Sequence, residues 1–313
     1  MRRFTHASIV AKVIDIPDEL IAQHERYGGE AGRAFVAALA GRGERFLEQW
    51  GLRLDGASMY GRCALVLPVL RADGTRAVLK LQDVDEETVG EPLALGAWRG
   101  DGAVRLLKAD GVTGTMLLER LDAGRPLAGL PGLPDLPDFR EATLVIARLL
   151  ARLTATEAPA GLRRLGDITA RLLERTAAVL PGVPEPAVRH LLADCAAAVR
   201  EVAGEPGDRL LHWDLHFDNV LGADRARWLA IDPKPLAGDP GFDLFPALWN
   251  RFDADEVHWR FDAMTDVLGL DRHRARAWTL ARVLQNSVWQ LEEHRTPLPE
   301  VLEIARRLRS PAS

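Results

Sequence analysis

Apolar residues recur at the 3.6-residue spacing of a helix in several stretches of the chain. The clearest stretch is 142–155 (ATLVIARLLARLTA), and residues 30–50 and 274–294 repeat the pattern. This spacing gathers apolar side chains on one helix face. Residues 167–180 and 185–204 show it as well. We therefore predict that helices dominate the chain beyond residue 140.

Residues 64–82 follow a different pattern, in which two short apolar runs flank a turn. ALVLPVL and AVLKLQ are separated by a segment that contains Asp73-Gly74, a pair that favours tight hairpin turns. The pattern predicts a β-hairpin. Because proline has no backbone N–H to donate, Pro68 predicts that the first strand lies at a sheet edge or bulges there.

The next segments complete a mixed first part of the chain. Residues 83–98 begin with acids and continue with apolar residues, which predicts a helix. The runs AVRLLKAD and GTMLLERL predict a second pair of strands around Gly111. Residues 122–138 are rich in Pro and Gly, as expected of a boundary. We therefore predict an α+β fold with a β-rich lobe over 1–121 and a larger, mainly helical lobe over 122–313.

Composition narrows the classes of protein that this chain can be. It has 313 residues, of which 47% are hydrophobic and 27% charged, as in an ordinary globular protein of two domains. The net charge of −5 argues against a nucleic-acid partner. With no apolar run long enough for a membrane, and with Lys12 and Asp15 interrupting the first apolar stretch, we expect no membrane association and a cytoplasmic location. Two cysteines make neither a disulfide framework nor a zinc site.

Lysine is scarce in this chain. Of the 40 basic residues, four are lysines, at positions 12, 80, 108 and 234. Arginine carries nearly all the other positive charge, so each retained lysine is a candidate for a specific role.

The segment after residue 211 interrupts the helical pattern and holds the densest chemistry. Acids there stand among apolar residues rather than along a polar helix face. His212-x-Asp214 is followed after four residues by Asn219, and Asp232 comes after the apolar run WLAI. Phosphoryl transfer requires a carboxylate beside the acceptor hydroxyl and oxygen ligands for Mg²⁺. The Asp–Asn spacing and the later Asp are those of a kinase catalytic loop and its metal-binding aspartate.

The first lobe contains a matching lysine. Lys80 lies in AVLKL, the second strand of the predicted hairpin, as the V-A-I-K lysine of kinases does. Its charge would neutralise nucleotide phosphates. An acid from the next helix should hold it, and we predict Glu91, with Glu86 and Glu87 as alternatives.

The strand end LLERL is where the chain would meet the base of the nucleotide. We expect backbone groups near Glu119, Arg120 and Leu121 to contact the adenine. The loop before the hairpin, residues 55–64, lacks a G-x-G-x-x-G motif, so its phosphate contacts are not assigned.

These motifs together resemble the aminoglycoside phosphotransferase superfamily, and within it the streptomycin 6-kinase and hydroxyurea phosphotransferase branch. The resemblance is carried by VLPVLRADGTRAVLKLQ, LALGAWRGDGAVRLL, MLLERLD, LLHWDLHFDNVLGADRARWLAIDPKPLAGDPGFDL and WTLARVLQNSVW, over about residues 64–289. It implies a bilobal, protein-kinase-like fold and ATP-dependent phosphorylation of a small-molecule hydroxyl. It makes Asp214 the catalytic base, Asn219 and Asp232 the Mg²⁺ ligands, and Lys80 the phosphate-binding lysine.

The acceptor implied by the resemblance is a cationic aminoglycoside, with streptomycin at its 6-hydroxyl as our prediction. Trp213 stands where many relatives have glycine and would shape the acceptor pocket. Acids and aromatic rings suit a cation. The further candidates for that pocket are His216, Gln285, Asn286 and Trp289. The competing interpretation is that Trp278, Leu284 and Trp289 are core residues and that the rest of the late helix is solvated. We expect a monomer.

Several alternatives stay open. Within the class they are hydroxyurea phosphorylation and a kinase for an endogenous metabolite. Outside it they are a metal-dependent hydrolase using His212, Asp214, His216 and Asp232, and a catalytically silent nucleotide-binding module. ATP and GTP are not distinguished.

Four residues of the same segment have roles outside the predicted active-site set. His212 is predicted to brace the loop. Asp239 and Asp243 are predicted to cap turns. Lys234 either reaches a phosphate or pairs with an acid.

Overall fold

A computed structural model describes residues 14–61, 63–129 and 138–309. The chain forms two compact units, Met1–Asp85 with Leu106–Arg120, and Glu86–Arg105 with Leu121–Ser313. The sequence assigns 86–105 to the first lobe, whereas the structure groups this segment with the second unit. Trp98 explains the difference, because its Nε1 donates to the carbonyl of Leu153 at 3.0 Å and its ring is 2% exposed.

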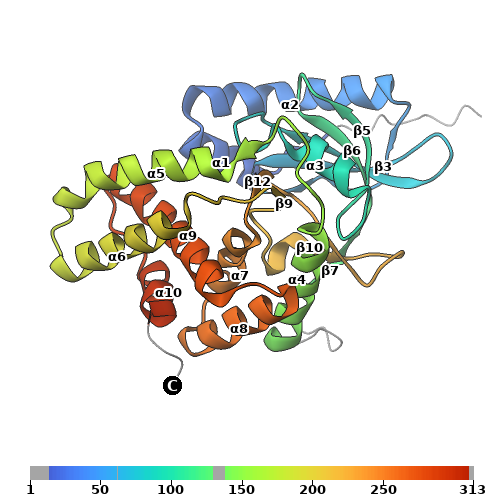
Figure 1. The fold of residues 1–313 in the computed structure, drawn as a ribbon. Coiled ribbons are helices and arrows are strands. Elements are labelled where there is room, and N and C mark those ends of the chain that lie inside the picture. Colours follow the sequence, from blue (N-terminus) through green and yellow to red (C-terminus); the bar gives the residue numbers. More distant parts are fainter. Residues whose placement is uncertain (1–13, 62, 130–137, 310–313) are drawn as a thin grey trace, which may run out of the picture. The chain divides into compact units, whose positions relative to one another are not determined.

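The first unit is built on one antiparallel sheet of order β1–β3–β4–β6–β5, with β2 also paired to β3 (Figure 1). The predicted hairpin is β3 and β4, and the predicted strand pair around Gly111 is β5 and β6, so both predictions are confirmed. The strands of this sheet are β1 (Arg53–Leu54), β2 (Met59–Tyr60), β3 (Ala64–Leu70), β4 (Arg76–Gln82), β5 (Leu106–Asp110) and β6 (Thr115–Glu119).

Pro68 was expected to mark an edge strand or a bulge, and the edge position is wrong, since β3 lies inside the sheet and pairs with β4 without a register shift. Its neighbours on one side are the two short strands β1 and β2, which pair with residues on either side of Pro68. The proline carbonyl accepts from the backbone N–H of Asp55 at 2.8 Å. The missing N–H therefore falls at the interruption between β1 and β2, where no ladder bond is lost.

Two helices, α1 (Asp18–Tyr27) and α2 (Gly29–Gln49), accompany this sheet. The buried side of α2 includes Phe35, Leu39 and Phe46, which form one apolar cluster with inward residues of β3 and β4. Gly43 permits the close approach, since a Cβ there would lie 2.5 Å from Ile14 Cδ1. The helix predicted at 30–50 is thus confirmed within one residue at each end.

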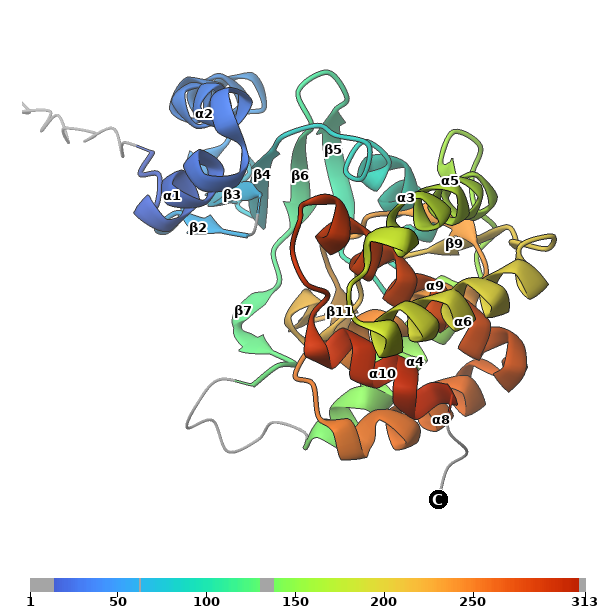
Figure 2. The same ribbon diagram turned by 90° about the vertical axis from the view of Figure 1, so that its left-hand side faces the viewer.

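The second unit is mainly helical, as predicted. Helix α9 is buried along most of its length and packs against α5, α6 and α10, and Figure 2 shows α6, α9 and α10 side by side. The helices are α3 (Glu91–Trp98), α4 (Phe139–Leu153), α5 (Leu165–Val179), α6 (Pro186–Val202), α7 (Phe245–Trp249), α8 (Val257–Leu268), α9 (Arg272–Glu292) and α10 (Pro299–Arg309), with short 3-10 turns η1 (Leu180–Gly182), η2 (Phe217–Asn219), η3 (Pro240–Asp243) and η4 (Ala254–Glu256).

The helix predicted over 83–98 is shorter than expected. It begins at Glu91, and Pro92 lies in its first turn, where a missing N–H costs nothing. Of the acidic residues before it, Glu86 and Glu87 lie in turns, and Asp83 and Asp85 lie in irregular chain. The predicted boundary segment 122–138 contains a strand, β7 (Asp122–Pro126), and its residues 130–137 lie outside the described residues. None of the described helices is long and apolar enough to cross a membrane.

Two small sheets position the chemistry of this unit. One has the order β11–β10–β7 and the other β8–β12–β9. The loop from β9 to β10 and the loop from β11 to β12 therefore start and end on paired strands, and they lie side by side. The strands are β8 (Arg163–Arg164), β9 (Arg209–Leu211), β10 (Val220–Gly222), β11 (Trp228–Ala230) and β12 (Leu236–Gly238).

Candidate active site

The loop that carries Asp214 is held by hydrogen bonds from its backbone to the carboxylate of Asp243. One carboxylate oxygen of Asp243 accepts the backbone N–H of His212 at 2.9 Å, and the other accepts that of Trp213 at 2.6 Å. Asp243 is fully buried, and burial raises its pKa to about 6 although both hydrogen bonds lower it. Asp243 was expected to cap a turn, and in the structure it binds two backbone N–H groups of the loop that carries the predicted base.

His212 braces the same loop from inside. Its Nδ1 accepts the N–H of Asp214 at 3.3 Å, so Nε2 carries the proton that it donates to the carbonyl of Ile231 at 3.0 Å. Burial lowers the pKa of His212 to about 4, which keeps the ring neutral. The contacts confirm the structural role, and they use both ring nitrogens that a metal would need.

Trp213 holds a strained backbone and a buried ring. Its φ is 67°, in the left-handed region that favours glycine. The side chain is 3% exposed, with the guanidinium carbons of Arg163 and Arg282 lying 4.4 and 4.7 Å from its ring centre. These cation–π contacts and the two hydrogen bonds to Asp243 hold Trp213 in this conformation.

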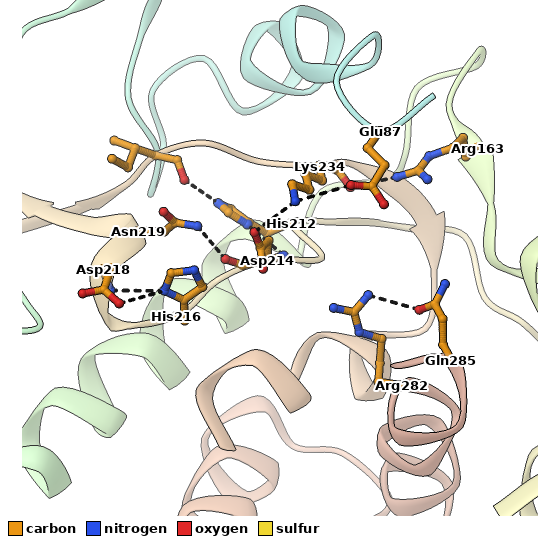
Figure 3. Close-up of polar contacts among 11 residues, drawn as sticks. Glu87, Arg163, His212, Asp214, His216, Asp218, Asn219, Lys234, Arg282 and Gln285 are labelled. Carbon is orange, nitrogen blue, oxygen red and sulfur yellow. Dashed lines mark hydrogen bonds and ion pairs between the residues drawn. The ribbon is translucent and has the colours of Figure 1, made fainter. Parts of the chain in front are cut away.

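Asp214 presents a partly exposed carboxylate next to a lysine. Lys234 Nζ lies 3.5 Å from Asp214 Oδ2 and 3.4 Å from Glu87 Oε2 (Figure 3). Burial lowers the pKa of Lys234, but the carboxylates of Asp214, Glu87 and Asp232 outweigh it and raise the pKa overall. The lysine therefore stays charged beside the predicted base.

Asn219 and Asp232 stand on the two facing loops. The backbone N–H of Ile231 donates to the carbonyl of Asn219 at 2.9 Å, which aligns the two loops. Asn219 Nδ2 donates to the carbonyl of Asp214 at 2.8 Å, leaving its Oδ1 as the side-chain acceptor. Asp232 has a left-handed φ of 59°. An amide oxygen and a carboxylate fit Mg²⁺, which takes few protein ligands and completes its shell with phosphate oxygens and water.

No group of three or more His, Cys, Asp or Glu side chains that could hold a metal ion occurs among the described residues. His216 engages its neighbour instead, since its Nδ1 accepts the N–H of Asp218 at 3.3 Å and its ring is the first cause that lowers the pKa of Asp218 to about 2. The alternative of a metal-dependent hydrolase is disfavoured by His212, because both of its ring nitrogens are already engaged in hydrogen bonds.

The predicted acceptor residues meet in part. A cavity of about 330 Å³ is lined by three of them, Trp213, Gln285 and Trp289, together with Glu86, Glu87, Arg163, Ile168, Arg171, Leu172 and Arg175. His216 and Asn286 do not line it. The amide of Asn286 donates to the carbonyl of Arg282 in its own helix. Trp278 and Leu284 are core residues, as the competing interpretation held, whereas Trp289, which it also placed in the core, is partly exposed.

The predicted nucleotide residues are distributed over both units. Lys80 lies on the inner strand β4 and is 5% exposed, unlike a solvent-facing lysine at a sheet edge. Glu119 ends β6, and Leu121 begins the next part of the second unit. Glu91 is the first residue of α3 and is 1% exposed. Their roles toward a nucleotide stay predictions.

Several residues of the site were not singled out by the sequence. Arg163 and Arg282 resemble ordinary surface arginines in sequence, and only the fold places them on Trp213. Glu87 was an alternative partner of Lys80, yet in the structure it pairs with Lys234. The scarcity of lysine was the one signal that pointed toward Lys234.

Comparison with known proteins decides the family. The model for the aminoglycoside/hydroxyurea antibiotic resistance kinases matches residues 49–294. This chain belongs to that family. It is 60% identical to a hydroxyurea phosphotransferase of Kitasatospora aureofaciens, over 93% of this chain and 84% of that protein. It is 51% identical to a streptomycin 6-kinase of Streptomyces glaucescens, over 96% of this chain and 98% of that protein.

Solved structures agree with the family in fold. A thermostable mutant of aminoglycoside phosphotransferase APH(4)-Ia, in a ternary complex with ADP and hygromycin B, aligns with a TM-score of 0.56 at 15% identity, over 86% of this chain and 98% of that chain. The predicted kinase-like fold is therefore confirmed, and the chain is a phosphotransferase of the antibiotic resistance kinase family.

Proposed function

We propose that this kinase transfers the γ-phosphoryl group of ATP to a hydroxyl group of streptomycin, at the 6-position, and so inactivates the antibiotic. The observation that carries the reaction class is the placement of Asp214. Its carboxylate stands on a loop held by Asp243 and His212, beside Asn219 and within 3.5 Å of a lysine. The relative from Streptomyces glaucescens supports the acceptor.

In the proposed reaction Asp214 accepts the proton of the acceptor hydroxyl. The hydroxyl oxygen bonds to the γ-phosphorus while the bond from that phosphorus to the β,γ-bridging oxygen breaks, and ADP leaves. Asn219 and Asp232 would hold Mg²⁺, which neutralises phosphate charge when bound. Lys80 is proposed to bind the phosphates and Glu91 to hold Lys80. Backbone groups near Glu119 and Leu121 are proposed to contact the adenine. Positioning and electrostatics supply most of the rate acceleration.

Nucleotide use is supported by the family and by the ADP complex of the APH(4)-Ia neighbour. The cavity that adjoins Lys234 through Glu87 is the proposed acceptor pocket. Its rings Trp213 and Trp289 suit a cationic acceptor, and its lining holds three arginines, Arg163, Arg171 and Arg175, beside Glu86 and Glu87. Arg171 pairs with Glu86 at 3.2 Å, which offsets part of the positive charge in the lining.

A second acceptor is favoured by one specific observation. The relative at 60% identity is a hydroxyurea phosphotransferase, and it shares more residues with this chain than the streptomycin 6-kinase of Streptomyces glaucescens does. Hydroxyurea is small and uncharged, and its N-hydroxyl group would take the place of the sugar hydroxyl with the same base.

The test is an ATP-consumption assay with Mg²⁺ and streptomycin, hydroxyurea, kanamycin or buffer, with mass spectrometry of the products. We expect one added phosphate on streptomycin. Phosphorylation of hydroxyurea alone would support the proposed reaction with a different acceptor. Phosphorylation of kanamycin would contradict the assignment to the streptomycin 6-kinase and hydroxyurea phosphotransferase branch. Asp214→Asn should lower kcat about 100-fold or more while ATP still binds. Near-normal turnover by that variant would refute Asp214 as the base.

A further inference from the structure

Lys234 connects the proposed base to the wall of the acceptor pocket. Its Nζ lies 3.5 Å from Asp214 Oδ2 and 3.4 Å from Glu87 Oε2, and Figure 3 shows the side chain reaching between the two carboxylates. The Lys234 side chain is 27% exposed, as is that of Asp214. This cation is therefore accessible to a molecule bound at Asp214.

The backbone of Lys234 is anchored by hydrogen bonds at its N–H and at its carbonyl. Its N–H donates to the carbonyl of His212 at 3.0 Å, and its carbonyl accepts from Arg163 Nη2 at 3.4 Å. Pro233 and Pro235 flank it and restrict the chain further. An anchored backbone with a long, flexible side chain delivers a positive charge to a defined place.

The distance from Asp214 determines which bound group the Lys234 ammonium can contact. A base must lie about 2.6–3.2 Å from the acceptor hydroxyl, and that oxygen about 3–3.5 Å from the phosphorus it attacks. The anionic oxygens of a phosphoryl group in this position lie within reach of Lys234 Nζ when its side chain rotates. A cationic acceptor is repelled by the same ammonium, so the phosphoryl group is the partner that the charge fits.

The neighbouring arginine is placed differently. The guanidinium of Arg282 lies over the rings of Trp213, Phe242 and Phe245, and its Nη1 donates to Gln285 Oε1 at 3.3 Å. These rings and the amide hold Arg282 in the core. Lys234, by contrast, pairs through its Nζ with the carboxylates of Glu87 and Asp214 and can exchange one of them for a phosphoryl oxygen.

We propose that Lys234 is a catalytic residue that contacts the γ-phosphoryl group during transfer. This inference rests on the proposed function. In the resting enzyme Lys234 pairs with Asp214 and Glu87. As the bond to the acceptor oxygen forms and the bond to ADP breaks, Lys234 donates to a non-bridging oxygen of the phosphoryl group, and Asp214 takes the hydroxyl proton.

The first experiment measures nucleotide affinity without an acceptor. Calorimetry with Mg²⁺ compares AMP-PNP, which has a γ-phosphoryl group, with ADP, which lacks one. Lys234→Met should weaken AMP-PNP binding about 10-fold and leave ADP binding within about 2-fold. Equal losses for both nucleotides, or no loss for either, would overturn the proposal. Because no acceptor is present, this result does not depend on whether streptomycin is the substrate.

The second experiment measures turnover with the acceptor that the panel identifies. Lys234→Met should lower kcat about 100- to 1,000-fold with the KM for the acceptor within about 3-fold, whereas Lys234→Arg should recover at least about 10-fold of the lost kcat. The matched control is Lys108→Met on strand β5, which should keep the wild-type kcat. If Lys234→Met does not fold, Lys234→Gln takes its place. A folded, uncharged variant with a kcat within about 3-fold of wild type would refute the inference.

Discussion

Asp243 provides a sharp test of how the catalytic loop is held. Each of its carboxylate oxygens accepts one backbone N–H of the loop, from His212 at 2.9 Å and from Trp213 at 2.6 Å. In Asp243→Asn one oxygen remains as an acceptor, and the amide NH₂ faces the second N–H donor. The change removes a charge and half of the clamp at nearly constant volume.

The expected effect on stability is small because two contributions oppose each other. Burial raises the pKa of Asp243 from 3.8 to about 6, so the ionised side chain costs about 3 kcal/mol in the folded state. Its contribution to stability is present below pH 3.8 and is lost as the pH rises through 6. Asparagine removes that cost at pH 7.5, while the lost hydrogen bond and the unpaired donor cost about 2–5 kcal/mol. We expect a net destabilisation of at most about 2 kcal/mol.

The expected effect on turnover is large. Trp213 holds a φ of 67°, which costs a non-glycine residue roughly 1–2 kcal/mol, and the clamp opposes its relaxation. When one bond is lost, the loop can relax and shift Asp214. A displacement of about 1 Å at a catalytic group costs on the order of 100-fold in rate. We therefore expect kcat to fall about 100-fold at pH 7.5.

The assay is phosphoryl transfer to the identified acceptor at pH 7.5, with thermal unfolding of the same samples. The matched control is Asp239→Asn. Asp239 accepts the N–H of Gly241 at 2.8 Å and pairs with Arg274 at 2.6 Å, without a hydrogen bond to the catalytic loop. This control should keep kcat within about 3-fold of wild type. A folded Asp243→Asn protein with the same kcat as that control would refute the argument.

Three further predictions follow from buried groups. Burial lowers the pKa of His212 to about 4, so its contribution to stability is present above pH 6.5 and is lost as the pH falls through 4. Between pH 7 and pH 4.5, wild type should lose up to about 3 kcal/mol more unfolding free energy than His212→Gln, as measured by urea unfolding. Equal losses in the two proteins would contradict this. Trp213→Gly relieves roughly 1–2 kcal/mol of backbone strain but removes a ring that is 3% exposed. The free energy of unfolding should therefore fall by about 2–4 kcal/mol, and an unchanged value would contradict the stabilising role of the ring. Burial raises the pKa of the Cys195 thiol to about 12, whereas Cys63 is exposed. A maleimide should therefore label Cys63 alone in the native protein and both thiols in urea, as counted by mass spectrometry. Two adducts on the native protein would contradict the burial of Cys195.

Local pattern was sufficient for most of the elements and for the core of the motif. The hairpin β3–β4 follows from two short apolar runs around Asp73-Gly74, and α2 from helical spacing, because both depend on residues a few positions apart. Asp214 and Asn219 belong to one short loop, so their spacing in sequence already limits their separation in space. The α+β fold class and the kinase family were therefore within reach of the sequence.

Partners that are distant in sequence were decided by the tertiary structure. Pro68 lies inside the sheet because two short strands leave a gap beside it, and the pairing of β1 and β2 cannot be derived from the residues around the proline. Segment 86–105 joins the second unit because Trp98 finds a buried place there. Both outcomes depend on surfaces that exist only after folding.

The same distinction runs through the active site. The sequence alone determined which residues we predict to carry phosphoryl-transfer chemistry, since side-chain type and spacing are local properties. The fold decided that Asp243 clamps the loop, that Glu87 and Asp214 share Lys234, and that arginines cover Trp213. These contacts join segments whose separation in space depends on the whole path of the chain, and no local pattern of hydrophobic and polar residues specifies that path.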